Sequence, residues 1–187
     1  MKKSKQLLYV ILMLFVANSF AQQPDSLKNN EHFELSFGQS LLFISNSRLA
    51  DIQNQAAIVV PTNAMLFFVE FRPQKLIKIP VFFNLPTETK QFLVNGKLFN
   101  EKASPTFGAG LEFRVFQIKI DSKSKLEFEA GPLFSFVFDT KNNIIIAPIL
   151  ASRFRIMRGE NFVMYIGASY SLGIEAIGLL YGTGTIF

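Results

Sequence analysis

The sequence predicts an all-β fold, an eight-stranded antiparallel up-and-down transmembrane β-barrel. Of the 187 residues, 49% are hydrophobic and 22 are Phe, yet no run of 18 uncharged apolar residues follows the N-terminal leader. This excludes membrane-spanning helices in the rest of the chain. Apolar residues instead alternate with small or polar ones in eight segments, as they do along barrel strands. The last segment, residues 178–187, ends on the final residue, Phe187.

The N-terminal segment has the order of a secretory signal peptide. Three lysines within the first five residues precede an apolar run, and cleavage is expected after Ala21. The next residue is Gln and not Cys, so a lipoprotein anchor is not expected. The predicted division of the chain is a signal peptide (1–21), a flexible periplasmic lead-in (22–31) and a barrel domain (32–187). Without the leader the net charge falls from +5 to +2, and no basic run remains that would favour nucleic acid.

Eight strands are expected, joined by connections of unequal length. Their predicted ranges in chain order are 32–44, 63–72, 76–85, 106–119, 126–138, 144–156, 162–170 and 179–187. Residues 73–74, 121–125 and 158–161 are predicted tight turns, whereas 45–60 and 85–105 are long loops. Short turns on the periplasmic side and long loops outside are typical of outer-membrane barrels, with both chain ends in the periplasm.

Four local features are expected within this pattern. Pro80 cannot donate to a β-ladder, which predicts a bulge in the third strand. Asn95-Gly96 lies between two short apolar runs and predicts a hairpin that projects beyond the barrel. The composition of residues 47–57 predicts a short surface helix. In the fourth strand, alternation places Val115 on the apolar face.

Alternation alone leaves two kinds of barrel open, because a soluble lipocalin-like carrier also alternates, with its apolar face inward. The less apolar face here consists of Gly, Ala, Ser and a few Glu and Arg, while nearly all lysines lie in predicted turns and loops. A water-facing exterior should carry more Lys, Asn, Thr and Asp along its strands. The choice of residues therefore favours the membrane barrel, with the soluble carrier as the alternative.

With the apolar face toward lipid, nine charged side chains point into the periplasmic half of the lumen. They are Glu34, Glu70, Arg72, Glu112, Arg114, Glu127, Glu129, Arg153 and Arg155. The acids nearly balance the arginines, as burial of arginine in a narrow lumen requires. We interpret the set as a charge-paired plug that closes the lumen to solutes. The alternative is a proton or ion path through the same network.

The outer half of the lumen is predicted to be apolar. Its inward-facing residues are Leu42, Leu66, Phe68, Phe82, Leu133, Ile145 and Ile149. Two interpretations remain open, ordinary core filling and a pocket for a lipid-like ligand.

Signals of catalysis are missing from the sequence. The single histidine, His32, lies at the periplasmic start of the first predicted strand, the wrong end for an enzyme that acts on outer-leaflet lipid. The chain has no cysteine, and no metal-ligand cluster, phosphate-binding loop or GxSxG motif is present. Neither an enzyme nor a metal or other cofactor is therefore expected.

The end of the chain, YGTGTIF from Tyr181 to Phe187, resembles the C-terminal signal that the insertion machinery of Gram-negative outer membranes reads. Together with IKIPV at 77–81 and GAGLEFR at 108–114, it makes the chain similar to small outer-membrane barrel families of the PorT or OmpA-barrel kind. The resemblance implies this fold, a location in the outer membrane, and membrane lipid and the insertion machinery as partners. It transfers no catalytic residue.

The expected role is that of a monomeric, non-enzymatic scaffold or interaction protein of the cell envelope. It would act through loops 45–60 and 85–105, because exposed apolar residues outside the bilayer mark contact sites. The second loop carries several such residues, namely Phe92, Leu93, Val94, Leu98 and Phe99. The alternative role is a binder or transporter of an apolar ligand in the outer half of the lumen.

Overall fold

A computed structural model describes residues 33–45, 57–138, 144–159, 161–172, 174 and 176–187. The predicted signal peptide and lead-in and His32 lie outside the described residues, as does nearly all of the helix expected at 47–57. Among the residues that are described, no helix is long and apolar enough to cross a bilayer.

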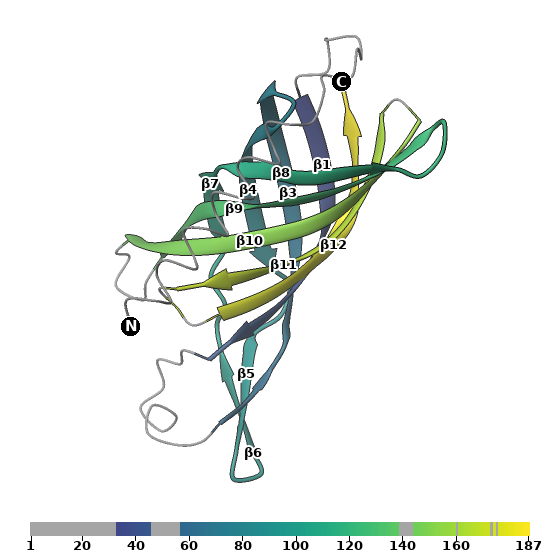
Figure 1. Ribbon diagram of the computed structural model, residues 1–187. Helices are drawn as coiled ribbons and strands as arrows, with labels where there is room; N and C mark the ends of the chain where they lie inside the picture. The colour runs from purple at the N-terminus through teal and green to yellow at the C-terminus, as the bar shows by residue number, and fades with distance from the viewer. Residues whose placement is uncertain (1–32, 46–56, 139–143, 160, 173, 175) are drawn as a thin grey trace, which may run out of the picture.

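The described chain is built from antiparallel strands (Figure 1). They are β1 (Phe33–Ile44), β2 (Ile58–Val60), β3 (Thr62–Gln74), β4 (Ile77–Pro86), β5 (Lys90–Val94), β6 (Lys97–Glu101), β7 (Thr106–Gly110), β8 (Glu112–Lys119), β9 (Ser124–Phe138), β10 (Ile144–Arg158), β11 (Phe162–Ser171) and β12 (Ala176–Ile186). In the barrel, β7 and β8 act as one strand interrupted at Leu111, and β2, β5 and β6 form a separate sheet. The predicted fold class, an eight-stranded antiparallel transmembrane barrel, is confirmed.

The barrel closes between its first and last strands. β1 pairs with β12 from Glu34 opposite Ile186 to Ile44 opposite Ala176. At the end of this seam, the Phe33 N–H donates to the Phe187 carbonyl (3.1 Å) and the Phe187 N–H donates to the Phe33 carbonyl (2.9 Å). This closure pairs the two strands that would otherwise form free edges of the barrel. A membrane-spanning sheet has to be closed in this way, because lipid offers no hydrogen bonds to an unpaired backbone.

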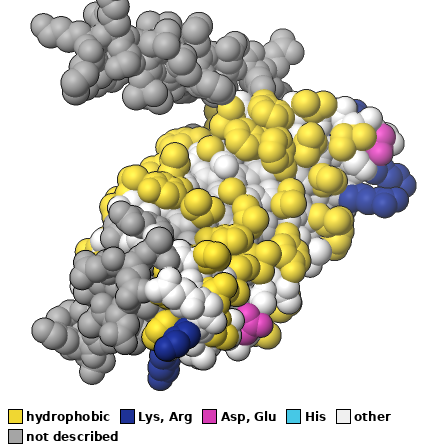
Figure 2. Space-filling view, turned by 90° about the horizontal axis from the view of Figure 1, so that it is seen from below, with side chains coloured by type: hydrophobic (Ala, Val, Ile, Leu, Met, Phe, Trp, Pro, Cys, Tyr) yellow, Lys and Arg dark blue, Asp and Glu magenta, His cyan; other side chains and the backbone are white. Residues whose placement is uncertain are grey.

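The outer wall of the barrel is apolar. On the face shown in Figure 2, hydrophobic side chains cover the wall and the few charged ones lie near its margins. Phenylalanines on adjacent strands meet as cross-strand neighbours, as in Phe37 with Phe67 (ring centroids 5.1 Å apart) and Phe128 with Phe154 (4.7 Å). Burial strictly alternates over the first eight residues of β1, so one face meets lipid and the other the lumen.

The predicted bulge at Pro80 is wrong. Pro80 stays in register opposite Glu70, and the irregularity lies one pair further along, where β3 shifts between Phe71 and Gln74. On its other side, β4 pairs with β7 from Val81 onward and with β8 only up to Lys78. Pro80 therefore lies where this ladder is interrupted, so its missing N–H does not break a continuous run of hydrogen bonds.

The unbroken alternation that was predicted through Val115 is also wrong. β8 shifts its register against β9 between Arg114 and Phe116, which places an extra residue in β8 at this point. Phe116 then stacks on Phe128 with ring centroids 5.5 Å apart. The alternation consequently changes phase after Arg114, which brings Gln117 opposite the inward-facing Glu127.

The hairpin expected around Asn95-Gly96 is present as β5 and β6. Both turn residues have positive φ angles, 49° at Asn95 and 77° at Gly96, which is the backbone of a type I′ turn. β2 extends this hairpin to a three-stranded sheet. The sheet projects from the barrel at the end opposite to the C-terminus (Figure 1).

Candidate functional site

A continuous network of charged side chains fills the half of the lumen next to the short turns. All nine residues predicted for this region take part in it, and their strands are β1, β3, β8, β9 and β10. A tenth member, Lys78 of β4, was not among the predicted residues and is buried with them. With Lys78 included, five acidic and five basic side chains neutralise one another.

Arg153 is the centre of the inner layer of this network. Its Nη1 lies 2.5 Å from Glu70 Oε1, and its Nη2 lies 2.7 Å from Glu112 Oε2 and 3.0 Å from Glu129 Oε2. Nε also donates to Glu129 Oε2 at 3.0 Å. The guanidinium is 1% exposed, so these contacts replace the water that an arginine otherwise keeps.

Arg155 organises the next layer toward the short turns. Its Nη1 donates to Glu127 and to Glu129, both at 2.9 Å, and its Nη2 pairs with Glu34. Lys78 Nζ pairs with Glu129 and lies 3.4 Å from Glu127. Glu129 therefore joins the two layers, because it accepts from cations in both.

Two arginines cover this network at the rim next to the short turns. Arg72 pairs with Glu34, and Arg114 Nη1 lies 3.1 Å from Glu127 Oε1 and donates to Gln117 at 2.5 Å. Their side chains are 14% and 15% exposed, whereas those of the other members are almost inaccessible. The network thus changes from dry to partly hydrated toward the end of the barrel.

Three carboxylates in the inner layer stand close enough to hold a cation. Oxygens of Glu70, Glu112 and Glu129 all lie within 4.8 Å of one another. The guanidinium of Arg153 contacts every one of them. Arginine therefore supplies the positive charge that a divalent ion would bring to such a cluster.

We expect the protein to show no steady ion conductance in planar bilayers. Paired side chains fill the lumen across one whole half, and an eight-stranded barrel leaves room for little else. Single-channel recording of the purified protein, with a known porin as the positive control, checks this. A stable, ion-selective step conductance would mean that water and ions pass the charge network.

Above the charge network, the outer half of the lumen contains a cavity of about 150 Å³. Six of the seven predicted apolar residues line it, namely Leu42, Leu66, Phe68, Phe82, Leu133 and Ile149. The seventh, Ile145, is 41% exposed and does not line the cavity. Arg153 and Glu112 reach the cavity from below, so its floor is the top of the network.

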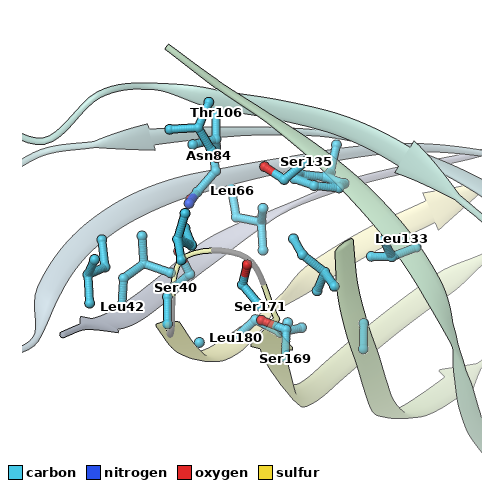
Figure 3. Close-up of a pocket in the computed structure, with 18 of the residues that line it drawn as sticks. Ser40, Leu42, Leu66, Asn84, Thr106, Leu133, Ser135, Ser169, Ser171 and Leu180 are labelled. Carbon is cyan, nitrogen blue, oxygen red and sulfur yellow. The ribbon is translucent and has the colours of Figure 1, made fainter. Parts of the chain in front are cut away.

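Hydroxyl and amide groups interrupt the apolar wall of this cavity, in contrast to the apolar lining that the sequence predicts. Ser40 donates to Asn84 Oδ1 at 2.9 Å, and Ser135, Ser169 and Ser171 also line the space (Figure 3). Ser171 is buried, and its hydroxyl has no hydrogen-bond partner among the described residues. Strand alternation would have found these groups, because they share the inward face with the predicted leucines.

Tyr165 of β11 is buried beside the top of the charge network. Its ring meets that of Phe68 edge to face at 5.9 Å, and the guanidinium carbon of Arg153 lies 5.9 Å from its centroid. Its hydroxyl lies over Gly38 and Gly182, a cross-strand pair of β1 and β12. Two adjacent glycines thus create the space that the Tyr165 hydroxyl occupies.

The two residues proposed as the C-terminal insertion signal lie on or beside the closing strand. Tyr181 is half exposed on the outer face, and its hydroxyl donates to Gln39 of β1 at 2.5 Å. Phe187 follows β12 and is exposed. Both positions are accessible from outside the barrel, and their part in insertion stays a prediction.

Comparisons with known proteins support the fold. The outer membrane protein OprG from Pseudomonas aeruginosa superposes with a TM-score of 0.55 at 12% identity, over 84% of this chain and 96% of OprG. The N-terminal β-barrel domain of Pseudomonas aeruginosa OprF gives a TM-score of 0.51 at 9% identity, over 85% of this chain and 98% of that domain. No protein-family model and no curated protein matches the sequence. The chain therefore shares the barrel fold of these outer-membrane proteins, while its predicted kinship to PorT-like families stays a prediction.

Proposed function

We propose that this protein is an integral outer-membrane barrel that binds a protein partner through the sheet of β2, β5 and β6. The location is supported by the closed barrel with its apolar wall, by the shared fold of OprF and OprG, and by the predicted signal peptide. A monomer suffices for this role, because the barrel closes on itself.

The observation that carries the proposal is that the projecting sheet has a core of its own. Phe92 is fully buried and packs with Val94, Ala57, Val59 and Phe99. A loop that only connected two strands would not need such a core. Packing of this kind holds the sheet in a defined shape outside the barrel, as a recognition surface requires.

The opposite face of this sheet is its candidate contact surface. Ile58, Leu93 and Leu98 lie in one row across the three strands, because Leu93 pairs with both of the others. Ile58 is 66% exposed and Leu98 is 53% exposed. Of the five loop residues expected to make contacts, Phe92 and Val94 are instead buried in the core. The proposed interface therefore centres on the row of Ile58, Leu93 and Leu98.

Deletion of residues 91–100 is expected to remove partner binding while leaving the barrel intact. The hairpin pairs with β2 and not with the barrel strands, so the barrel ladders do not depend on it. The variant should still reach the outer-membrane fraction and migrate differently in electrophoresis with and without boiling. A protein that co-purifies with the wild type should be lost.

A point variant sharpens this test. Leu98→Asp places a charge in the exposed row and should also abolish co-purification, whereas Asn100→Asp adds the same charge on the same strand outside the row and should not. If the partner stays bound to the deletion variant and to Leu98→Asp, the sheet is not its binding surface. Recovery of the wild type in the soluble periplasm would instead favour the lipocalin-like carrier.

A second candidate function is binding of an apolar ligand, and the cavity in the outer half of the lumen favours it. A well-packed interior has few voids larger than a water molecule, and this one lies under the loop end of the barrel. Mass spectrometry of the small molecules that co-purify with the barrel tests this function independently of the projecting sheet.

A further inference from the structure

The lumen changes in chemistry from its floor to its mouth. The floor is the charge network, in which acids and bases cancel. An apolar cluster rests directly on it, since Phe68 packs over the Arg153 guanidinium at 5.3 Å. Above that cluster come the hydroxyl and amide groups, and two lysines from the connection between β4 and β7 complete the lining. Polar groups therefore return to the lining above the apolar cluster.

The neutral floor sets the orientation of a ligand. All of the Arg153 nitrogens that face carboxylates are already engaged by Glu70, Glu112 and Glu129. An anionic group placed there would meet carboxylates as well as the guanidinium and would lose its water without a free cation. The inner end of a ligand should therefore be apolar, and its charged end should face the mouth.

The mouth provides a positive charge. Lys102 lines the cavity, is exposed, and forms no ion pair with another described residue. Lys90 lines it too, but its Nζ lies 2.7 Å from Glu101 Oε1 and is already neutralised. Among the described residues at this rim, Lys102 is accordingly a cation that is available to an anion.

A buried hydroxyl also points to a polar ligand group. Ser171 is 5% exposed, its Oγ has no partner among the residues that the structure describes, and Figure 3 shows this side chain at the cavity. An unpartnered buried hydroxyl is unfavourable, so it is usually satisfied by water or a ligand. Ser171 is placed to donate to a ligand oxygen.

The size of the cavity limits the ligand to one chain. An apolar cavity of about 150 Å³ holds roughly a benzene-sized group. The space here has the same volume, so it accommodates the end of a single acyl chain and not the several chains of a membrane lipid.

We propose that the cavity binds a single-chain amphiphile with an anionic head group. Its chain end lies against Leu66, Phe82 and Leu133, and its head group accepts from Ser171 and faces Lys102. The proposal rests on the second candidate function, ligand binding in the lumen, and adds the ligand class and its orientation.

Binding of radiolabelled dodecanoate to the mature protein in phosphatidylcholine nanodiscs tests the proposal, with protein-free nanodiscs subtracted. Saturable binding of one molecule per barrel is expected. Once the chain is too short to fill the cavity, each further methylene removed should weaken binding about fourfold, because each buried methylene contributes a constant free energy. Lengthening the chain past the depth of the cavity should add nothing.

Matched variants separate the cavity from the lipid face. Ile149→Trp fills the cavity and should lower affinity at least tenfold. Leu150→Trp adds the same ring to the next residue, which is 60% exposed on the outer wall, and should leave binding unchanged. Loss of binding in Leu150→Trp together with its retention in Ile149→Trp would overturn the cavity as the site.

Variants of the two residues proposed to contact the head group test whether the ligand is anionic. Lys102→Glu should weaken dodecanoate roughly threefold to tenfold and leave dodecanol unaffected, as expected for one exposed charge pair. Ser171→Ala should weaken dodecanoate by a similar factor, without lowering the thermal stability of the barrel. Equal binding of dodecanoate and dodecanol, unchanged by both variants, would overturn the anionic head group while leaving ligand binding in place. If neither dodecanoate nor dodecanol showed saturable binding, both the anionic head group and ligand binding in the lumen would be overturned.

Discussion

Replacement of Arg153 by alanine is expected to lower the free energy of unfolding by about 3 to 5 kcal/mol. The change leaves Glu70, Glu112 and Glu129 close together in a region with almost no access to water. Three carboxylates so placed repel one another once the guanidinium that contacts all of them is gone. Urea titration of the barrel in lipid vesicles, followed by electrophoretic mobility, measures the effect.

Two further variants distinguish the charge network from a general effect of removing arginine. Arg158→Ala removes an exposed arginine from the end of the same strand and should change stability by less than about 0.5 kcal/mol. Arg153→Lys keeps the charge but loses the planar guanidinium that reaches several carboxylates. Its loss of stability should therefore lie between those of Arg153→Ala and Arg158→Ala. A near-neutral result for Arg153→Ala would show that water enters the network.

Gly182→Val is expected to cost about 3 kcal/mol or more, or to prevent folding of the barrel. A Cβ at this position would lie 2.5 Å from the Tyr165 hydroxyl oxygen and 2.6 Å from the Gly38 Cα. The Tyr165 ring is enclosed, and the Gly38 Cα belongs to a paired backbone, so neither can move away cheaply. The fraction of protein that becomes heat-modifiable after refolding reports the loss.

Tyr165→Phe is the matched control for the glycine variant. It keeps the buried ring and both glycines and removes only the hydroxyl over them, which has no hydrogen-bond partner among the described residues. Stability should be unchanged or slightly raised, because no hydrogen bond is lost. A marked loss would mean that the hydroxyl has a partner, such as an ordered water, that matters for the fold.

The sequence predicts the inward face well because strand alternation has a period of two. Once the apolar face is assigned to lipid, the same count places Glu34, Glu129 and Arg153 in the lumen, which is where the structure brings them together. Lys78 could have been found in the same way. It shares the parity of Phe82, which is predicted to face inward, but it stands apart from the other lysines, nearly all of which lie in predicted turns and loops.

Other features of the barrel could not be derived from the alternation of residues along the strands. The extra residue in β8 near Val115 changes the phase of the strand, and nothing in FRVFQIK marks its position. The place of Pro80 depends on where two neighbouring strands stop pairing with β4. Lys102 reaches the cavity from a long connection, where no periodicity relates a residue to the lumen.

The seam between β1 and β12 bears on the order in which the barrel assembles. The ladders of β9 with β10, β10 with β11 and β11 with β12 join strands that follow one another in the chain. The seam instead joins Phe33 to Phe187, so closing it restricts nearly the whole described chain at once. Local hairpins should therefore form early and the seam last, which makes the rate of closure depend on long-range contacts. Pulse-labelled hydrogen exchange during refolding should protect the amides of β9 and β10 before those that join β1 to β12, and simultaneous protection would contradict this order.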